Sequence, residues 1–210
     1  NEYTSLNLSY PPRFTHVTTE AEALAELSSR EYGLIICMPN MDHSDIFATA
    51  NEIKRRYPEI PIVVLTPFSK EVSKRVANED LSAIDYVFSW LGNSELLLAI
   101  IKLIEDKMNA PDDTKSVGVQ IILLVEDSIR FYSSALPHLY KFVLAQSQEF
   151  SKEALNAHQQ NLRMRGRPKI LLARTYEEAI DIFETYKNNT LGIVSDMSFM
   201  HDGRKDQFAG

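Results

Sequence analysis

The sequence predicts an α/β protein in which a doubly wound parallel sheet is built twice along the chain. Short apolar runs of strand length alternate with amphipathic helical stretches over most of the 210 residues. This alternation is typical of parallel sheets with helices on both faces. Two further observations indicate two copies. A polar stretch divides the chain near its middle, and the motif at residues 18–24 recurs at 174–180 with Thr, Glu and Ala at matching positions.

The first half alternates strand and helix four times. Its strand-like runs are continuously apolar, and its helices carry apolar residues at three- and four-residue spacing. Pro58 and Pro61 separate one helix from the strand that follows it. The expected strands are residues 14–17, 33–37, 62–66 and 85–90, and the expected helices are residues 20–30, 42–57, 69–78 and 93–107. Residues 1–108 therefore form the first expected domain, and the polar, proline-containing stretch 109–117 reads as a linker.

The second half, residues 118–210, starts the same pattern again. Its expected strands are residues 119–128, 169–173 and 190–196, with a helix at 176–186. A helical insertion at about 129–168 follows the first strand and is roughly twice as long as one helix and turn require. Leu136, Leu139, Tyr140, Val143 and Leu144 lie at helical spacing within it, with Pro137 as a helix start or kink. That stripe needs a partner, which either a homodimer through Leu136–Leu155 or the neighbouring copy can supply.

Acidic residues end two of the strands in the second half. Glu126 and Asp127 follow the apolar run at 119–125, and Asp196 ends the run at 190–195. In a parallel sheet both runs deliver their acids to the carboxyl edge, where ligands bind. Three carboxylates gathered there repel one another unless a cation lies among them. Mg²⁺ is a hard ion that binds through carboxylates and phosphate oxygens, so the pattern indicates a phosphoryl-accepting pocket.

These residues resemble the receiver domain of bacterial two-component response regulators. The acidic pair at the end of the first strand and the aspartate at the end of the third are the features that carry the resemblance. It implies a flavodoxin-like fold with strand order 2-1-3-4-5. It also implies that Asp196 is the phosphoacceptor and that Glu126, Asp127, Asp196 and the backbone carbonyl of Ser198 bind Mg²⁺. The phosphodonor would be a histidine kinase or phosphotransfer protein, and the activity that of a phosphorelay switch rather than an enzyme.

The first copy resembles the same family but lacks its acids. Cys37 or Met38 stands where the phosphoacceptor is expected, and an alternative alignment gives Ile35. Thr66 matches the switch hydroxyl of the family, whereas Ser89 stands in place of its lysine. We therefore expect residues 1–108 to be a degenerate receiver that cannot accept phosphate and serves packing or partner contacts.

The second copy is expected to be incomplete, with strands one to three only. The switch hydroxyl and the lysine of the family have no counterpart in residues 118–210. An open sheet of three strands exposes an unpaired edge. Three explanations remain open: a fragment of a longer protein, segments missing from the sequence, or two incomplete halves that complete each other within or between chains.

Composition excludes several other classes. The net charge of −7 argues against general nucleic-acid binding, which needs clustered Lys and Arg. No run approaches 18 apolar residues, and no signal peptide is visible at the start of the sequence. Together with the single cysteine, these features favour a cytoplasmic protein with no membrane span.

Two rival functions fit part of the pattern. An aspartate-nucleophile phosphohydrolase of the haloacid dehalogenase type also begins at a strand-ending aspartate, but it requires a second Asp where this chain has Ser198. A purely structural or dimerisation tandem of pseudo-receivers would leave the acids without a role. Such a tandem could regulate an attached enzyme, and the arrangement resembles the N-terminal region of proteins with phosphoenolpyruvate synthase-like domains.

Overall fold

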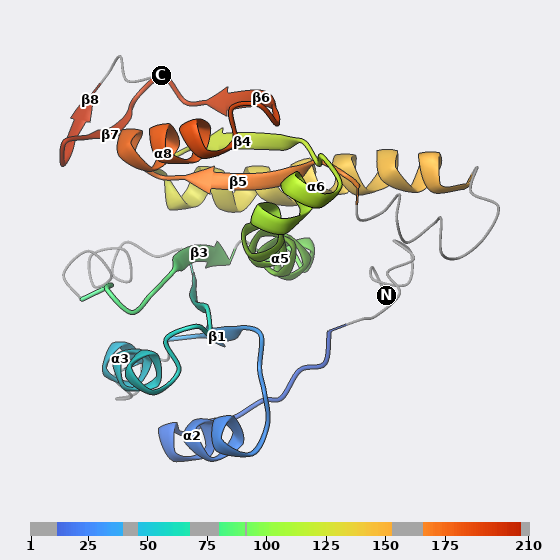
Figure 1. Cartoon of the computed structure of the whole chain (residues 1–210). Coiled ribbons are helices and arrows are strands. Elements are labelled where there is room, and N and C mark those ends of the chain that lie inside the picture. The colour runs from blue at the N-terminus through green and yellow to red at the C-terminus, as the bar shows by residue number, and fades with distance from the viewer. Residues whose placement is uncertain (1–11, 40–45, 68–79, 91, 153–165, 207–210) are drawn as a thin grey trace. The chain divides into compact units, whose positions relative to one another are not determined.

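The computed structural model describes residues 12–39, 46–67, 80–90, 92–152 and 166–206 (Figure 1). The chain divides into two compact units between Asn93 and Ser94. Each unit contains a small parallel sheet of three strands, together with helices. The α/β class predicted from the alternation of apolar runs is therefore confirmed.

The first unit contains a sheet with strand order β1-β2-β3, in which both neighbouring pairs are parallel. Strands β2 and β3 are almost continuously buried, as expected for apolar strands covered on both faces. Helix α3 buries Phe47, Ala50 and Ile53 at the predicted spacing. The described elements of this unit are α2 (Glu20–Ser29), β1 (Ile35–Cys37), α3 (Ile46–Arg56), β2 (Ile62–Pro67) and β3 (Tyr86–Trp90).

Two expectations for the first unit need comment. The strand expected at residues 14–17 is absent, because these residues form neither a helix nor a strand and Phe14 is 64% exposed. A run of four residues with one large apolar side chain offers too little to bury for a strand to be held in place. The helix expected at residues 69–78 lies outside the described residues, as does the start of the helix expected at 42–57.

The second unit contains a parallel sheet with strand order β5-β4-β6 and a separate antiparallel hairpin, β7-β8. Helix α8 packs on β4 and β5, whereas α5 packs against α6 and β5. The elements are α5 (Glu95–Ser116), β4 (Ile121–Val125), α6 (Ile129–Lys152), β5 (Lys169–Ala173), α8 (Tyr176–Tyr186), β6 (Thr190–Ser195), β7 (Phe199–His201) and β8 (Arg204–Asp206).

The motif shared by the two halves acts as a helix start in both. The side chain of Thr19 accepts a hydrogen bond from the Glu22 backbone N–H, and Thr175 does the same for Glu178. The glutamate in turn accepts from the backbone N–H of the residue before the N-cap, since Thr18 N–H donates to Glu22 and Arg174 N–H to Glu178. The repeated residues therefore cap helices at equivalent places, with a complete capping box at the start of α2 and a Thr175 side-chain cap at the start of α8.

The prediction of a linker at residues 109–117 is wrong, because most of this stretch is helical. Helix α5 continues to Ser116, with Ala110 and Asp113 buried at 0% and 1% exposure. Asp113 pairs with Lys169 of β5 at 3.0 Å. The helix ends at Ser116, and two residues later Gly118 has a φ of +69°, a conformation that glycine adopts without strain. One polar residue of this stretch, Asp113, is thus used in a buried contact, and the chain divides before α5 rather than after it.

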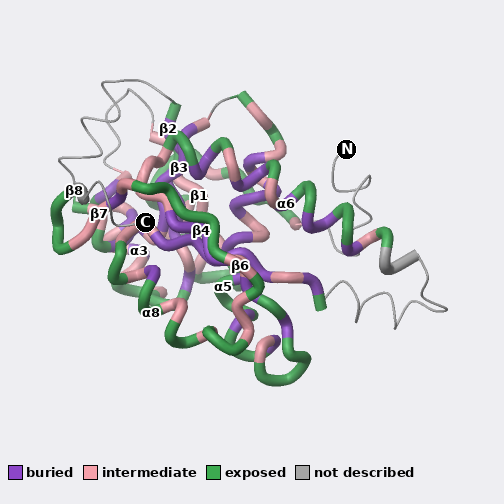
Figure 2. Tube along the Cα trace, turned by 90° about the horizontal axis from the view of Figure 1, so that it is seen from above, coloured by how far each residue is buried: buried purple, intermediate pink, exposed green. Residues whose placement is uncertain are grey.

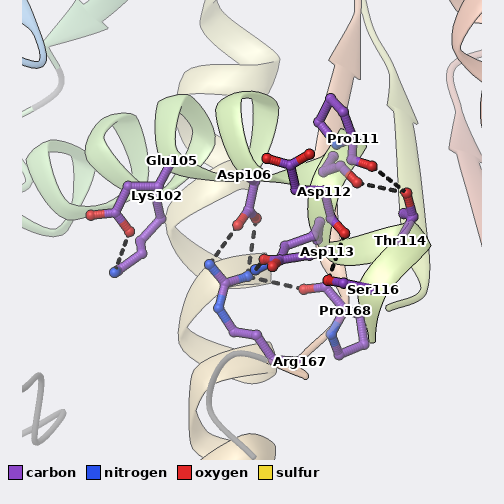
Figure 3. Close-up of polar contacts among 12 residues, drawn as sticks. Lys102, Glu105, Asp106, Pro111, Asp112, Asp113, Thr114, Ser116, Arg167 and Pro168 are labelled. Carbon is purple, nitrogen blue, oxygen red and sulfur yellow. Dashed lines mark hydrogen bonds and ion pairs between the residues drawn. The ribbon is translucent and has the colours of Figure 1, made fainter. Parts of the chain in front are cut away.

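A second buried ion pair fastens α5 to the sheet. The Asp106 carboxylate accepts from Arg167 Nη2 at 2.6 Å and Nη1 at 3.0 Å (Figure 3). It also accepts from the Tyr140 hydroxyl at 3.0 Å and the Ile170 backbone N–H at 2.9 Å. Asp106 is 0% exposed and Arg167 6%. One carboxylate therefore joins α5, α6 and the start of β5.

The long helix expected after the first strand of the second unit is present as α6. Four of the five residues in its predicted stripe are buried, and Leu139 is half-buried. Pro137 lies inside α6 and does not begin it. Because α5 packs on α6, the stripe finds a partner within the chain. A homodimer through Leu136–Leu155 stays a prediction, and its last residues lie outside the described ones.

Candidate functional site

The predicted acids of the second unit meet at the carboxyl edge of its sheet. Val125 pairs with Ser195 in the register of β4 and β6, and the Asp196 N–H donates to the Val125 carbonyl at 3.0 Å. The next residues along both strands must therefore be neighbours. Glu126, Asp127 and Asp196 each offer a carboxylate oxygen, and these oxygens all lie within 4.8 Å of one another.

The backbone around the acids holds them in place. The Glu126 N–H donates to the Ala173 carbonyl at 2.9 Å, which ties the end of β4 to the end of β5. The Ser128 N–H donates to Glu126 Oε1 at 2.9 Å, and the Met197 N–H donates to Asp196 Oδ1 at 2.7 Å. Glu126 and Asp127 are half-buried, whereas Asp196 is exposed. Asp196 is therefore the member of the cluster that an incoming reactant can approach.

The donor set fits a small hard cation. Mg²⁺ binds oxygen at about 2.1 Å, so octahedral ligands are roughly 3 Å apart when adjacent and about 4.2 Å apart when opposite. Carboxylate oxygens within 4.8 Å of one another reach those separations by small side-chain rotations. The cluster can thus hold Mg²⁺ while Asp196 keeps one oxygen for another bond, because each carboxylate has two.

Ser198, the fourth predicted ligand, lies on a short segment between Asp196 and β7. It is half-buried and occupies a bend. The next residue, Phe199, is 2% exposed and packs with Leu123, Val125 and Ala173 of the sheet and Ala179 of α8. The carbonyl of Ser198 therefore lies between Asp196 and a buried aromatic side chain.

The hairpin β7-β8 was not anticipated from the sequence, although a signal for it is present. Asp202 and Gly203 form its turn with φ of +50° and +70°. An Asp-Gly pair with positive φ at both residues is the preferred two-residue hairpin turn. The flanking stretches, three residues each, are too short to stand out as strands by periodicity.

A second group of potential ligands lies where this hairpin meets α8. Glu177, His201 and Asp202 offer donor atoms within 4.8 Å of one another. The Asp202 N–H donates to Glu177 Oε1 at 2.8 Å, and this bond is the main cause that lowers the pKa of Glu177. The His201 ring contacts the Tyr176 ring at a tilt of 43°, with ring centroids 4.4 Å apart. These contacts fasten the hairpin to the first turn of α8.

The corresponding edge of the first unit has different chemistry. Cys37 ends β1 and Met38, which follows it, is 60% exposed. Thr66 and Ser89 are paired in the register of β2 and β3 and are both buried. The Thr66 hydroxyl donates to the Phe88 carbonyl at 3.5 Å. Burial raises the pKa of the Cys37 thiol to about 11, so it is a neutral group rather than a substitute for a carboxylate.

Exposure differs sharply between neighbouring strands of the second unit. Figure 2 shows β4 largely buried beside β6, which is mostly exposed. Leu191, Ile193 and Val194 are each about half exposed, at 52%, 51% and 48%. The apolar run at 190–195 thus forms an edge strand of the described sheet. Its side chains are less buried than the apolar sequence of the run predicts.

Comparison of the chain with protein-family models, curated proteins and solved structures finds no match. No helix among the described residues has the length and apolar character needed to cross a membrane. The functional argument therefore depends on the geometry of the acids and on the chemistry that such a cluster supports.

Proposed function

We propose that the second unit is a phosphoryl-accepting receiver in which Asp196 is the acceptor. Glu126, Asp127, Asp196 and the Ser198 carbonyl would hold Mg²⁺. The observation that carries the proposal is that carboxylates from the ends of two neighbouring parallel strands lie within 4.8 Å of one another. A solvated surface has no need of this arrangement, because three like charges at such distances raise one another's energy unless a cation joins them.

Strand order supports the same proposal. Numbered within the second unit, β4, β5 and β6 are its first, second and third strands, so the order β5-β4-β6 is 2-1-3. This is the beginning of the flavodoxin-like order 2-1-3-4-5, in which ligands bind at the first and third strands where the order reverses. Those two strands are β4 and β6, which carry the acids.

The chemistry follows from the positions of the oxygens. An Asp196 oxygen attacks the phosphorus of a partner's phosphohistidine, the phosphorus–nitrogen bond breaks, and the imidazole keeps the electron pair and takes up a proton. Mg²⁺ neutralises charge on the transferred oxygens when it is bound. Glu126 and Asp127 are half-buried, and Glu126 is hydrogen-bonded to Ala173 at the end of β5 and to the Ser128 N–H, so these two acids stay in place while Asp196 reacts. The product is an aspartyl phosphate with about two negative charges.

The partners follow from this chemistry. The donor is a histidine kinase or a phosphotransfer protein, and the protein acts as a switch whose added charge changes how a partner reads its surface. The first unit carries Cys37, Met38, Thr66 and Ser89 at the equivalent edge, and none of these side chains is a carboxylate. It serves as a pseudo-receiver for packing or partner contacts, in a bacterial phosphorelay.

The test is intact-protein mass after incubation of the full chain with Mg²⁺ and acetyl phosphate. We expect a mass gain of one phosphoryl group that requires Mg²⁺ and is lost in Asp196→Asn. Asp181→Asn is the matched control, because Asp181 is an exposed acid on α8, and this variant should react as the parent does. No gain in a folded protein refutes the proposal and leaves the structural tandem. Catalytic hydrolysis of a phosphate ester by the same protein would instead indicate a phosphohydrolase.

A further inference from the structure

The segment after Asp196 crosses the end of the central strand. The Asp196 N–H donates to the carbonyl of Val125, the last residue of β4, so Asp196 lies on the side of β4 where β6 pairs. Four residues later, Met200 pairs with Thr175, which lies two residues beyond the end of β5. Because β4 lies between β5 and β6, residues 197–199 must pass from one side of β4 to the other. We call residues 197–199 the strap.

The strap is short relative to the distance that it crosses. Neighbouring strands are about 4.8 Å apart, so the crossing from β6 to β5 covers roughly 10 Å. Four residues span at most about 13 Å when fully extended. The crossing therefore takes up about three quarters of the reach of this segment, so its two ends restrict where the residues between them can lie. Ser198 is at the middle of this span.

Two contacts fasten the far end of the strap. Phe199 is buried among Leu123, Val125, Ala173 and Ala179. Beyond it, the Asp202 N–H donates to Glu177 Oε1 at 2.8 Å, which holds the turn of the hairpin on the first turn of α8. Glu177 makes this contact across 25 residues of sequence, so it is a tertiary contact and not part of the helix cap.

We infer that Phe199 and Glu177 are positioning residues that hold the Ser198 carbonyl at the metal site. The inference rests on the proposed function and extends it. Because the hairpin β7-β8 is held on α8, it sets the affinity of the acidic cluster for Mg²⁺. A carbonyl ligand on a fastened strap loses little conformational freedom when the cation binds, whereas one on a loose strap must be ordered first. Groups that orient metal ligands typically change metal affinity by 10–100-fold when they are removed.

Glu177 gives the sharper test, because Phe199 belongs to the core and its removal can unfold the unit. Mg²⁺ binding to the full chain is measured by calorimetry for Glu177→Ala, Glu177→Gln and the control Glu184→Ala. Gln retains an oxygen that accepts from the Asp202 N–H, and Glu184 is an exposed acid of the same helix paired with Lys187. We expect affinity to fall roughly tenfold in Glu177→Ala and to be restored in Glu177→Gln. It should remain unchanged in Glu184→Ala.

A second measurement distinguishes a loss of ligand positioning from a general loss of folded structure. At saturating Mg²⁺, the rate of phosphorylation of Glu177→Ala by acetyl phosphate should return to within about twofold of the parent rate, because the cation then completes the site by mass action. Equal affinities for the parent and Glu177→Ala overturn the inference. Glu177→Gln as weak as Glu177→Ala also overturns it, since the effect would then be one of charge. Asp127→Asn should abolish Mg²⁺ binding to the candidate site. If the parent shows no Mg²⁺ binding, or only binding that persists in Asp127→Asn, the proposed function itself is refuted.

Discussion

Removal of the Asp106 carboxylate should destabilise the second unit more than any surface change on the same helix. In Asp106→Ala, the donors of Arg167, Tyr140 and Ile170 lose an acceptor that is 0% exposed. The guanidinium remains at a position that is 6% exposed. Burial by itself would lower the pKa of Arg167, but the charge and hydrogen bonds of Asp106, together with Tyr140 and Glu105, leave that pKa above its ordinary value. Without Asp106 the same burial acts on an unpaired charge.

The magnitude follows from these contacts. Loss of one partner of a buried, hydrogen-bonded ion pair costs about 3–5 kcal/mol. A domain has a total stability of about 5–15 kcal/mol, so this is a large share. With a urea dependence of about 2 kcal/mol per molar, the midpoint of unfolding falls by roughly 2 M. The matched control is Asp112→Ala, because Asp112 is an exposed aspartate six residues further along α5 and should change stability by at most about 0.5 kcal/mol.

The assay must report on the second unit alone. The single tryptophan, Trp90, lies in β3 of the first unit, so its fluorescence follows the wrong part of the molecule. Hydrogen exchange of peptides from β5 and α6, measured across a urea series, follows the unit that contains the ion pair. If Asp106→Ala and Asp112→Ala shift the exchange midpoint equally, the buried pair contributes nothing beyond a surface charge and the reasoning is wrong.

Two further predictions concern the ends of elements. Gly118→Ala should lower stability by about 1 kcal/mol in the same exchange assay, because φ is +69° and an added Cβ meets no atom within 4 Å, so the cost comes from the backbone alone. Gly192→Ala, in β6 of the same unit, where φ is not positive and an added Cβ meets no atom within 4 Å, is its control and should be neutral or stabilising. The Cys37 thiol, with its pKa raised to about 11 by burial, should react with iodoacetamide at pH 8 far more slowly than a free thiol of ordinary pKa. Its rate, followed by intact mass, should rise as the pH approaches 11, and fast reaction at pH 8 would contradict the burial argument.

The positions of most elements could be predicted because their signals are local. The expected bounds of β5 and α8 agree with those observed, since Pro168 precedes the strand and Thr175 caps the helix. The acids of the candidate site were found for the same reason: each follows directly after an apolar strand, and parallel pairing brings such ends together. The parallel pairing of β4 and β6 is the one distant contact that this prediction assumed.

The misassigned linker has its cause in a contact that is distant in sequence. Residues 109–116 resemble a linker because they contain Pro111 and several charges. They are helical because Asp113 finds Lys169, a partner that the local pattern cannot reveal. A charged stretch is usually solvated, so sequence reasoning assigned it to the surface. Only the pairing partner, more than fifty residues away, changes that conclusion.

The candidate site shows both kinds of information side by side. Its acids can be identified from local sequence, because they directly follow the apolar runs that form β4 and β6. Its geometry also depends on where the chain goes after Asp196, and that path is fixed by Phe199 in the core and by Glu177 on α8. A carboxylate cluster can be recognised from strand ends alone, whereas the rigidity that would make it a metal site depends on contacts made by residues with no part in the chemistry. The comparison of Glu177→Ala with Glu177→Gln is informative for this reason, because it changes the fastening while the acids of the site are left untouched.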